Sequence, residues 1–399
     1  MTDANSAGTS EPVPAIDHAR TAETVLDTTL PDVSLGERGL RLRLSGGEAY
    51  FNYYWLRDAC PTAMDPETRE RTFDLVALQA PPRPGEARIE GGTLAIDWAN
   101  EAHVSRIPLA TLERFAAGRA APDPAAIARK PWGADAAFLR VAQTSVERDD
   151  NALARLACAL IEDGIAIVTG MEDSDESLTR LVHRLGPVVP SAEGGYFDVR
   201  LSIAPTNLAF TAKALEPHTD LPSEEHAPGV QFLHCRRNSV EGGRSLFIDG
   251  VAVAEALRGE DPAAFALLAT HDVPFSYRHD GHDFRAHQRV IELDHRGAVE
   301  GVTVSQHLQD PMDLPQALLD DFYPALARFL SMLREDRFTC RFRLNAGECV
   351  VFDNHRVVHG REAFVAESGE RHLRGCYTDR GAVRSTYRVL SDAAGGRSA

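Results

Sequence analysis

His218 and Asp220 are the residues of this chain whose types and spacing point most directly to chemistry. Only Thr219 separates them. In an extended segment, residues i and i+2 face the same side, so an imidazole and a carboxylate could offer two neighbouring metal ligands. His359 is the candidate for a third ligand. Two histidines and one carboxylate are the ligand set of non-haem Fe(II) oxygenases, which leaves coordination positions open for a co-substrate and oxygen.

Neither feature is specific when taken alone. The chain has 15 histidines, so a His-x-Asp sequence also arises by chance, and His359 could be a hydrogen-bonded core histidine. Arg371 makes the iron hypothesis more specific. An oxygenase that uses 2-oxoglutarate needs a cation for the far carboxylate, and arginine binds a carboxylate with two parallel donors. Arg361 and Arg374 are the alternative candidates for that role.

Length and composition exclude several classes of protein. The chain has 399 residues, of which 43% are hydrophobic and 25% charged, so it can bury a core and is not disordered throughout. The net charge of −17 argues against nucleic acid and anionic membranes as partners. No apolar run is long enough to span a membrane. Six scattered cysteines suit a reducing compartment, and we expect a cytoplasmic protein.

Patterning along the chain predicts two folded domains. They are a small β-rich N-terminal domain over 31–115 and a jelly-roll domain over 136–390, joined by a linker over 116–135. Residues 1–30 are predicted to be a disordered tail without a signal peptide. The alternation in Leu40–Leu44 predicts a strand. Thr93–Leu109 is predicted to form two strands joined by a turn at Asn100.

The second domain is predicted to be mainly β with flanking helices. Helical spacing predicts helices over 150–164, 176–185 and 317–334. Short apolar runs predict strands over 165–168, 230–235, 245–248, 289–293, 302–304, 339–344 and 349–352, with a hairpin turn at 345–347. Many short strands with helices outside favour a double-stranded β-helix, or jelly roll.

Six segments of the chain resemble the γ-butyrobetaine dioxygenase and trimethyllysine dioxygenase family, within the wider taurine-dioxygenase-like group. They are Phe51–Pro61, Asn207–Pro222, Pro228–Cys235, Gly242–Gly250, Phe352–Phe364 and Glu370–Asp379. The resemblance implies an Fe(II)- and 2-oxoglutarate-dependent dioxygenase. It implies that His218, Asp220 and His359 bind iron, that Arg371 anchors 2-oxoglutarate, and that Leu233 and Ser245 contact the same co-substrate.

The family holds a trimethylammonium group in an aromatic cage, which cation–π attraction explains. The resemblance carries the cage to Phe197, Phe210 and Tyr377, with Glu193 where the family has a fourth aromatic residue. It carries the contact with the substrate's anionic end to Asn207, and the family's Asn-Asn pair falls at Ser305 and Gln306. These departures leave open a carboxylate substrate like γ-butyrobetaine and a phosphonate like trimethylaminoethylphosphonate.

Some relatives bind structural zinc in the first domain through cysteines and a histidine. Only Cys60 and His103 stand in matching positions, while Thr62 and Met64 replace further thiolates, so we expect no structural zinc. We expect a homodimer that oxidises an unactivated C–H bond by hydroxylation, desaturation or rearrangement. The alternatives are a taurine-like sulfonate or carboxylate oxygenase with no cation requirement and a catalytically silent jelly-roll binding module.

Overall fold

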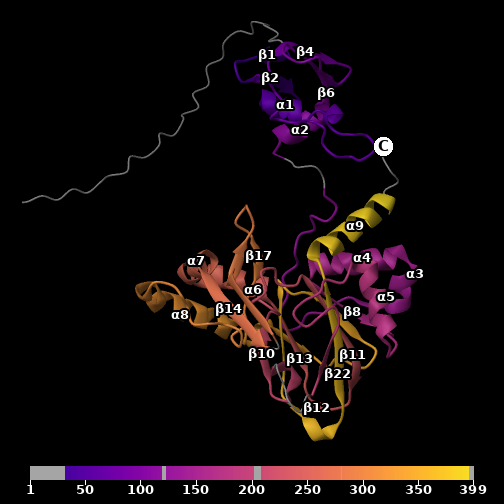
Figure 1. Ribbon diagram of the computed structural model, residues 1–399, viewed down its shortest axis with the longest axis vertical. Helices are drawn as coiled ribbons and strands as arrows, with labels where there is room; N and C mark the ends of the chain where they lie inside the picture. The colour runs from indigo at the N-terminus through magenta and orange to yellow at the C-terminus, as the bar shows by residue number, and fades with distance from the viewer. Residues whose placement is uncertain (1–31, 119–122, 202–207, 280, 395–399) are drawn as a thin grey trace, which may run out of the picture. The chain divides into compact units, whose positions relative to one another are not determined.

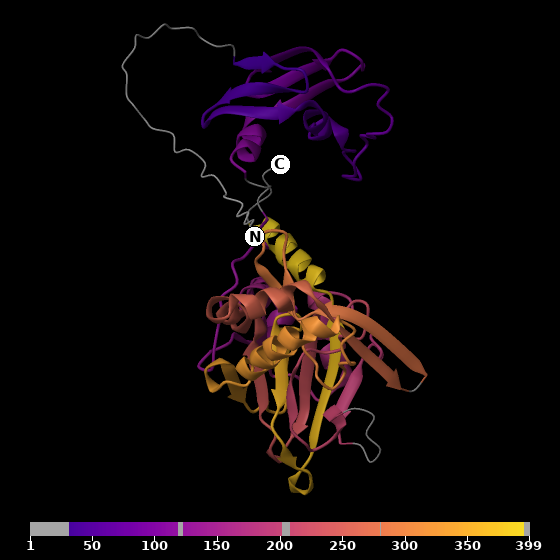
Figure 2. The ribbon, with the colours of Figure 1, turned by 90° about the vertical axis from the view of Figure 1, so that its left-hand side faces the viewer.

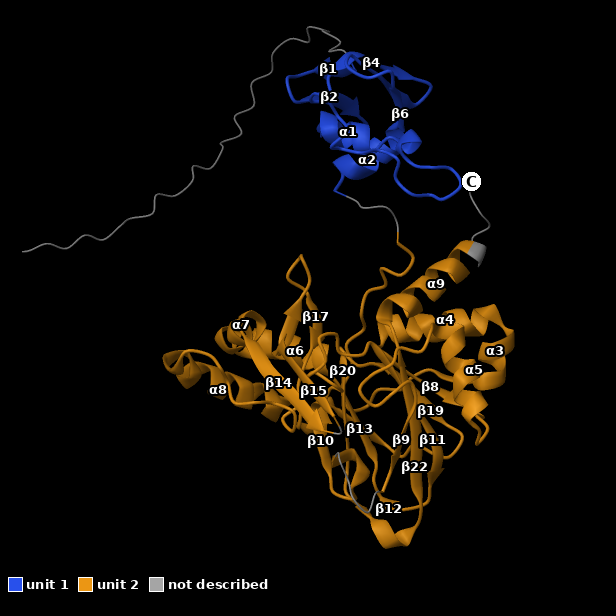
Figure 3. Ribbon diagram, in the orientation of Figure 1, with its two compact units in different colours: residues 1–122 blue, residues 123–399 orange. Residues whose placement is uncertain are grey.

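The chain divides into two compact units, residues 1–122 and residues 123–399 (Figure 3). A computed structural model describes residues 32–118, 123–201, 208–279 and 281–394. The predicted tail, 1–30, lies outside the described residues. The boundary between the units falls within the range 116–135 that we predicted as a linker.

The first unit contains two small antiparallel sheets around one apolar cluster. One sheet has the order β1-β2-β3, the other β4-β5-β6. The first sheet consists of β1, Val33–Leu35, β2, Gly39–Leu44, and β3, Gly47–Asn52. The second consists of β4, Pro84–Glu90, β5, Thr93–Trp98, and β6, Val104–Pro108. The helices are α1, Tyr53–Asp58, and α2, Leu109–Ala116. Leu40 and Leu42 of β2 are fully buried, as their alternation predicts, and β5 pairs with β6 as expected. Whether this unit folds alone stays a prediction.

The second unit is built on two β-sheets. The larger has the order β7-β8-β19-β11-β22-β9 and is antiparallel except for β7 and β8. Its strands are β7, Arg140–Ala142, β8, Ile165–Thr169, β19, Cys349–Asp353, β11, Val230–Asn238, β22, Arg371–Thr378, and β9, Phe197–Arg200. The smaller sheet has the antiparallel order β10-β20-β13-β18. Its strands are β10, Leu215–His218, β20, Val357–Arg361, β13, Ser245–Asp249, and β18, Thr339–Phe342.

Apolar side chains from both sheets meet in the interior, where Phe247, Phe352 and Leu373 belong to one buried cluster. Helices cover the outer faces (Figure 1). On the larger sheet lie α3, Gln143–Arg148, α4, Asp150–Glu162, α5, Asp175–Leu185, and α9, Arg380–Ala394. On the smaller sheet lie α6, Gly250–Glu260, α7, Pro262–Thr270, and α8, Gln316–Met332. This mainly β arrangement with flanking helices is the predicted jelly roll.

Three short pairings complete the second unit. β14, Asp272–His279, and β15, His282–Arg289, form a hairpin that reaches away from the sheets in Figure 2. The other pairs are β16, Ile291–Leu293, with β17, Val299–Val302, and β12, Glu241–Gly242, with β21, Phe364–Val365. The predicted strand 302–304 therefore overlaps β17 only at Val302.

The predicted hairpin at 345–347 is wrong. The strands on either side of this turn, β18 and β19, do not pair with each other. β18 pairs with β13 in the smaller sheet, while β19 lies between β8 and β11 in the larger one. Gly347, with φ of +80°, therefore turns the chain from one sheet to the other.

Part of the predicted linker packs on the second unit. Arg129 donates a hydrogen bond to the carbonyl of Val299, and the indole of Trp132 donates to the carbonyl of Asp163 at 2.7 Å. All six cysteines are free. No helix in the described ranges has the length and apolar character needed to cross a membrane.

Candidate metal centre and active-site cavity

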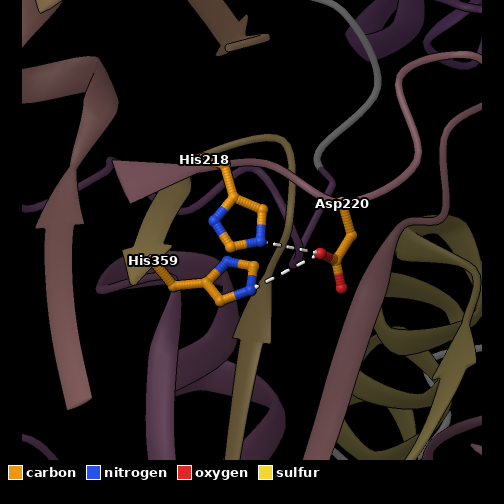
Figure 4. A group of neighbouring side chains, drawn as sticks. All are labelled: His218, Asp220 and His359. Carbon is orange, nitrogen blue, oxygen red and sulfur yellow. Dashed lines mark ion pairs between the residues drawn. The ribbon is translucent and has the colours of Figure 1, made fainter. Parts of the chain in front are cut away.

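His218, Asp220 and His359 converge at the β10 edge of the smaller sheet (Figure 4). His218 ends β10 and lies directly opposite His359 of the neighbouring strand β20. The Nε2 atoms of His218 and His359 lie 3.3 Å and 3.6 Å from Oδ1 of Asp220. The three possible ligand atoms all lie within 4.8 Å of one another, so a single ion could contact all three.

Neighbouring groups orient two members of this triad, His218 and Asp220. Nδ1 of His218 lies 2.9 Å from the carbonyl of Glu216, so it can donate there and leave the Nε2 lone pair for a metal. The backbone N–H of Asp220 donates to the side chain of Asn354, which donates back to the Asp220 carbonyl. The hydroxyl of Tyr377 donates to Oδ2 of Asp220 at 2.8 Å. His218 and Asp220 are therefore each held in place by their own contacts.

The protonation states suit a metal. Burial, and then the nearby His218, lower the pKa of His359 to about 3, so its imidazole is neutral at pH 7. Burial by itself raises the pKa of Asp220, but His359, His218 and the Tyr377 hydroxyl outweigh burial and hold that pKa below its ordinary value. The imidazoles of His218 and His359 and one carboxylate, buried together, fit a divalent cation of the Fe(II) kind.

A cavity adjoins the triad, and most of the predicted site residues line it. Among its lining residues are the predicted 2-oxoglutarate contacts Arg371, Leu233 and Ser245 and the predicted substrate contacts Phe197, Phe210, Tyr377 and Glu193. The cavity therefore joins residues from both sheets and from the loop that ends at β10.

Three arginines were candidates for the co-substrate anchor, and their surroundings differ. The Arg361 guanidinium donates to the carbonyls of Ala209, Thr211 and Lys213, so it holds that loop. Arg374 lies on the other face of its strand, where it pairs with Asp198 and Asp175, and it is not among the cavity-lining residues.

Arg371 is the arginine best suited to bind an anion. It is 9% exposed, lines the cavity, and its Nε has no hydrogen-bond partner within the described residues. Burial, and then the nearby Arg361, lower its pKa to about 10, which still leaves it charged at pH 7. A buried cation facing a cavity without a protein carboxylate beside it favours a ligand carboxylate.

Two of the remaining predicted substrate contacts, Ser305 and Gln306, are not among the residues that line the cavity. Asn207 lies outside the described residues. Ser305 is buried but does not line the cavity. Gln306 is exposed, and its amide oxygen accepts a hydrogen bond from Arg334. The assignment of these three residues to the substrate stays a prediction.

Sequence reasoning missed two neighbours of the site. Gln231 lines the cavity, is 2% exposed, and its amide oxygen has no partner in the described part of the chain. Its signal was its position two residues before Leu233 on β11, which puts both side chains on one face. The His307 ring lies 5.1 Å from the ring of His218, edge to face. No local pattern indicates that contact.

Thr62 lies close to Cys60 and His103, the two residues that we considered for structural zinc. Its hydroxyl lies 3.0 Å from the Cys60 thiol and 3.4 Å from Nε2 of His103. The expectation of no structural zinc stays a prediction.

Comparison with known proteins agrees with this geometry. Residues 125–377 match the family described as taurine catabolism dioxygenase TauD, TfdA family. The chain is 36% identical over 346 residues to the γ-butyrobetaine dioxygenase of Pseudomonas sp. (strain AK-1), covering 85% of this chain and 90% of that protein. It is 33% identical to the human γ-butyrobetaine dioxygenase over 65% of this chain and 68% of that one. It is 27% identical to the mitochondrial trimethyllysine dioxygenase of Gallus gallus, over 88% and 86%.

A jelly roll with two histidines and one aspartate beside a cavity that contains a buried arginine is the arrangement of an Fe(II)- and 2-oxoglutarate-dependent dioxygenase, and the chain is an enzyme of that class. Within the class it belongs to the TauD/TfdA family, together with the γ-butyrobetaine and trimethyllysine dioxygenases.

Proposed function

We propose that this enzyme binds Fe(II) through His218, Asp220 and His359 and oxidises a C–H bond of a small trimethylammonium acid. One observation carries the proposal. A single cavity contains Arg371 and Tyr377, six residues apart on β22, with the triad beside Tyr377. Six residues of strand span about 20 Å at roughly 3.3 Å each. That length accommodates an acid anchor, a metal and a cation site in series.

Iron, when bound, would supply the oxidising chemistry that no side chain offers. The protein's contribution is position and charge. Arg371 would hold the far carboxylate of 2-oxoglutarate with paired donors, beside the Ser245 hydroxyl and the apolar Leu233. The buried Tyr377 hydroxyl would stay protonated, because burial and Asp220 raise its pKa, and would keep the carboxylate of Asp220 oriented.

The cation would meet an aromatic and acidic wall. The rings of Phe197 and Tyr377 stack at a centroid distance of 5.2 Å, which leaves no room for a cation between them. A trimethylammonium group would therefore contact the open side of this stack, near Phe210 and the Glu193 carboxylate. The anionic end of the substrate, carboxylate or phosphonate, would be held by polar groups that we predicted at Asn207, Ser305 and Gln306.

The experiment is a screen of trimethylammonium carboxylates and phosphonates for succinate release with iron and 2-oxoglutarate, followed by product identification. The product distinguishes hydroxylation, desaturation and rearrangement. Each active compound is then compared with its neutral tert-butyl isostere, which has the same shape but no charge. A desolvated cation–π contact contributes about 2 kcal/mol, so the isostere should bind on the order of tenfold more weakly.

Equal affinity for the charged and the neutral ligand would reject the cation site and favour a taurine-like oxygenase. A catalytically silent binding module would release no succinate with any compound. The double variant His218→Ala/Asp220→Ala should lose turnover, whereas His183→Ala, a change of an exposed histidine on α5, should not. The expected homodimer and the expected cytoplasmic localisation stay predictions.

A further inference from the structure

Gly375 stands in the middle of the cavity-facing side of β22. Alternate residues of this strand, Arg371, Leu373 and Tyr377, line the cavity, and Gly375 lies in the same series. It is opposite Leu233 of β11 on one side and opposite Phe197 of β9 on the other. The cavity-facing side of β22 therefore lacks one side chain, between Leu373 and Tyr377.

The Phe197 ring occupies the space of that side chain. A Cβ atom added to Gly375 would lie 2.4 Å from Cζ and 2.5 Å from Cε2 of Phe197, far inside van der Waals contact. The backbone of Gly375 does not have a positive φ, so its conformation is one that alanine also adopts. A side chain at position 375 is therefore excluded by the Phe197 ring and not by the backbone conformation.

The position of the Phe197 ring in turn shapes the wall beside the metal centre. The ring stacks on Tyr377 with planes 30° apart, and the Tyr377 hydroxyl bonds to the candidate ligand Asp220. β9 is an edge strand, held on its other face by Asp198, which pairs with His372 and Arg374 of β22. With the strand held, a displaced ring would have to move into the cavity.

We propose that Gly375 is a specificity-determining residue: its missing side chain lets Phe197 lie flat on β22 and stack on Tyr377, which sets the depth and shape of the substrate wall. This inference rests on the proposed function, because it takes that wall as the surface that meets the substrate. It adds that Gly375 and Phe197 act as one unit, so that a change of either alters substrate selection without altering the 2-oxoglutarate site.

The test is a cycle of Gly375→Ala, Phe197→Ala and the double variant. Gly375→Ala alone should raise the substrate KM roughly tenfold, since forcing a side chain into a filled site has a penalty of that order. The KM for 2-oxoglutarate should stay close to that of wild type, because Phe197 is not among the proposed 2-oxoglutarate contacts. In the double variant the new methyl group has the space that the ring left, so its substrate KM should equal that of Phe197→Ala. Gly259→Ala on α6, where an added Cβ meets nothing within 4 Å, is the matched control.

Two results would overturn the inference. One is the same rise in substrate KM from Gly375→Ala whether or not Phe197 is present, which would indicate a backbone effect. The other is a crystal structure of Gly375→Ala in which the Phe197 ring still stacks on Tyr377. The cycle uses whichever ligand the wild type binds, charged or neutral. Loss of the cation preference would therefore reject the proposed function and leave the Gly375 inference standing, and the crystal structure decides the inference without any substrate.

Discussion

Arg361, Arg371 and Arg374 show how the surroundings of one residue type decide its role. Arg361 donates to three backbone carbonyls, and Arg374 pairs with carboxylates on the outer face of the sheet. Arg371 lines the cavity, and no acidic residue in the described ranges acts on its pKa. A buried charge that pairs with no carboxylate of the described residues indicates a ligand of opposite charge.

Arg371→Lys tests the anchor role. Lysine keeps the charge but loses the paired, planar donors, which should weaken 2-oxoglutarate binding by roughly 1.5–3 kcal/mol. We therefore expect the KM for 2-oxoglutarate to rise about 10- to 150-fold. The measurement is succinate formation against 2-oxoglutarate concentration. Arg237→Lys is the control, since Arg237, on the neighbouring strand β11, forms an exposed pair with Glu370. An unchanged KM in Arg371→Ala would transfer the anchor role to Arg361, the other of the three arginines that lines the cavity.

At the scale of elements, β22 and its edge neighbour β9 carry much of the site. The inner face of β22 runs from Arg371 to Tyr377, and β9 adds Phe197. β9 has four residues and one neighbouring strand, so few ladder bonds hold it. Asp198 adds two contacts on the outer face, to Nε2 of His372 at 2.7 Å and to the Arg374 guanidinium at 2.9 Å.

The Asp198 contacts predict a pH-dependent contribution to stability. Burial raises the pKa of Asp198, but His372 and Arg374 outweigh it and hold the pKa below its ordinary value. The folded pKa is thus below the unfolded pKa. The stabilisation is fully present above the unfolded pKa, about 3.9, and is lost as pH falls through the lower folded value.

Asp198→Asn should therefore lower the thermal midpoint at pH 7, and the difference from wild type should shrink as pH falls below about 4. Thermal unfolding followed from pH 3 to pH 8 checks this. Asp320→Asn, a change of an exposed residue on α8, should have no such trend. A difference that stays constant over the whole pH range would show that the charge of Asp198 does not hold β9.

At the scale of the whole second unit, one buried ion pair connects segments far apart in the chain. Arg356 is 1% exposed, and its guanidinium donates twice to the Asp249 carboxylate, at 3.1 Å and 2.8 Å. The same group donates to the carbonyls of Glu162, at the end of α4, and Lys130. Asp249 also caps the start of α6. The contact joins both helical layers to the segment after residue 123.

Arg356→Ala should cost about 3–5 kcal/mol of the free energy of unfolding, because it leaves the Asp249 charge buried without its cation. Chemical denaturation with a probe in the second unit measures this loss. Arg388→Ala is the control: its pair with Asp123 is 42% and 38% exposed, so its loss should lower the free energy of unfolding far less. A loss in Arg356→Ala as small as that of the control would contradict the prediction.

The sequence by itself determined the features that depend on local geometry. His218 and Asp220 share a face because alternate residues of an extended segment do so, and α4 and α5 follow from apolar spacing over 11–13 residues. Residue type made His359 and Arg371 candidates, but only the resemblance to a family assigned them their proposed roles, since nothing local distinguishes one histidine or arginine from another.

Tertiary structure alone decided which residues meet across the chain. The turn at Gly347 looks like a hairpin, but its two strands find better partners in different sheets. Gln306 follows the family's substrate position along the chain, yet its side chain lies at the surface with Arg334. Gly375 needs no side chain only because β9 brings Phe197 against it. Such contacts join residues far apart in sequence, and their geometry depends on strand order and register, which local spacing does not encode.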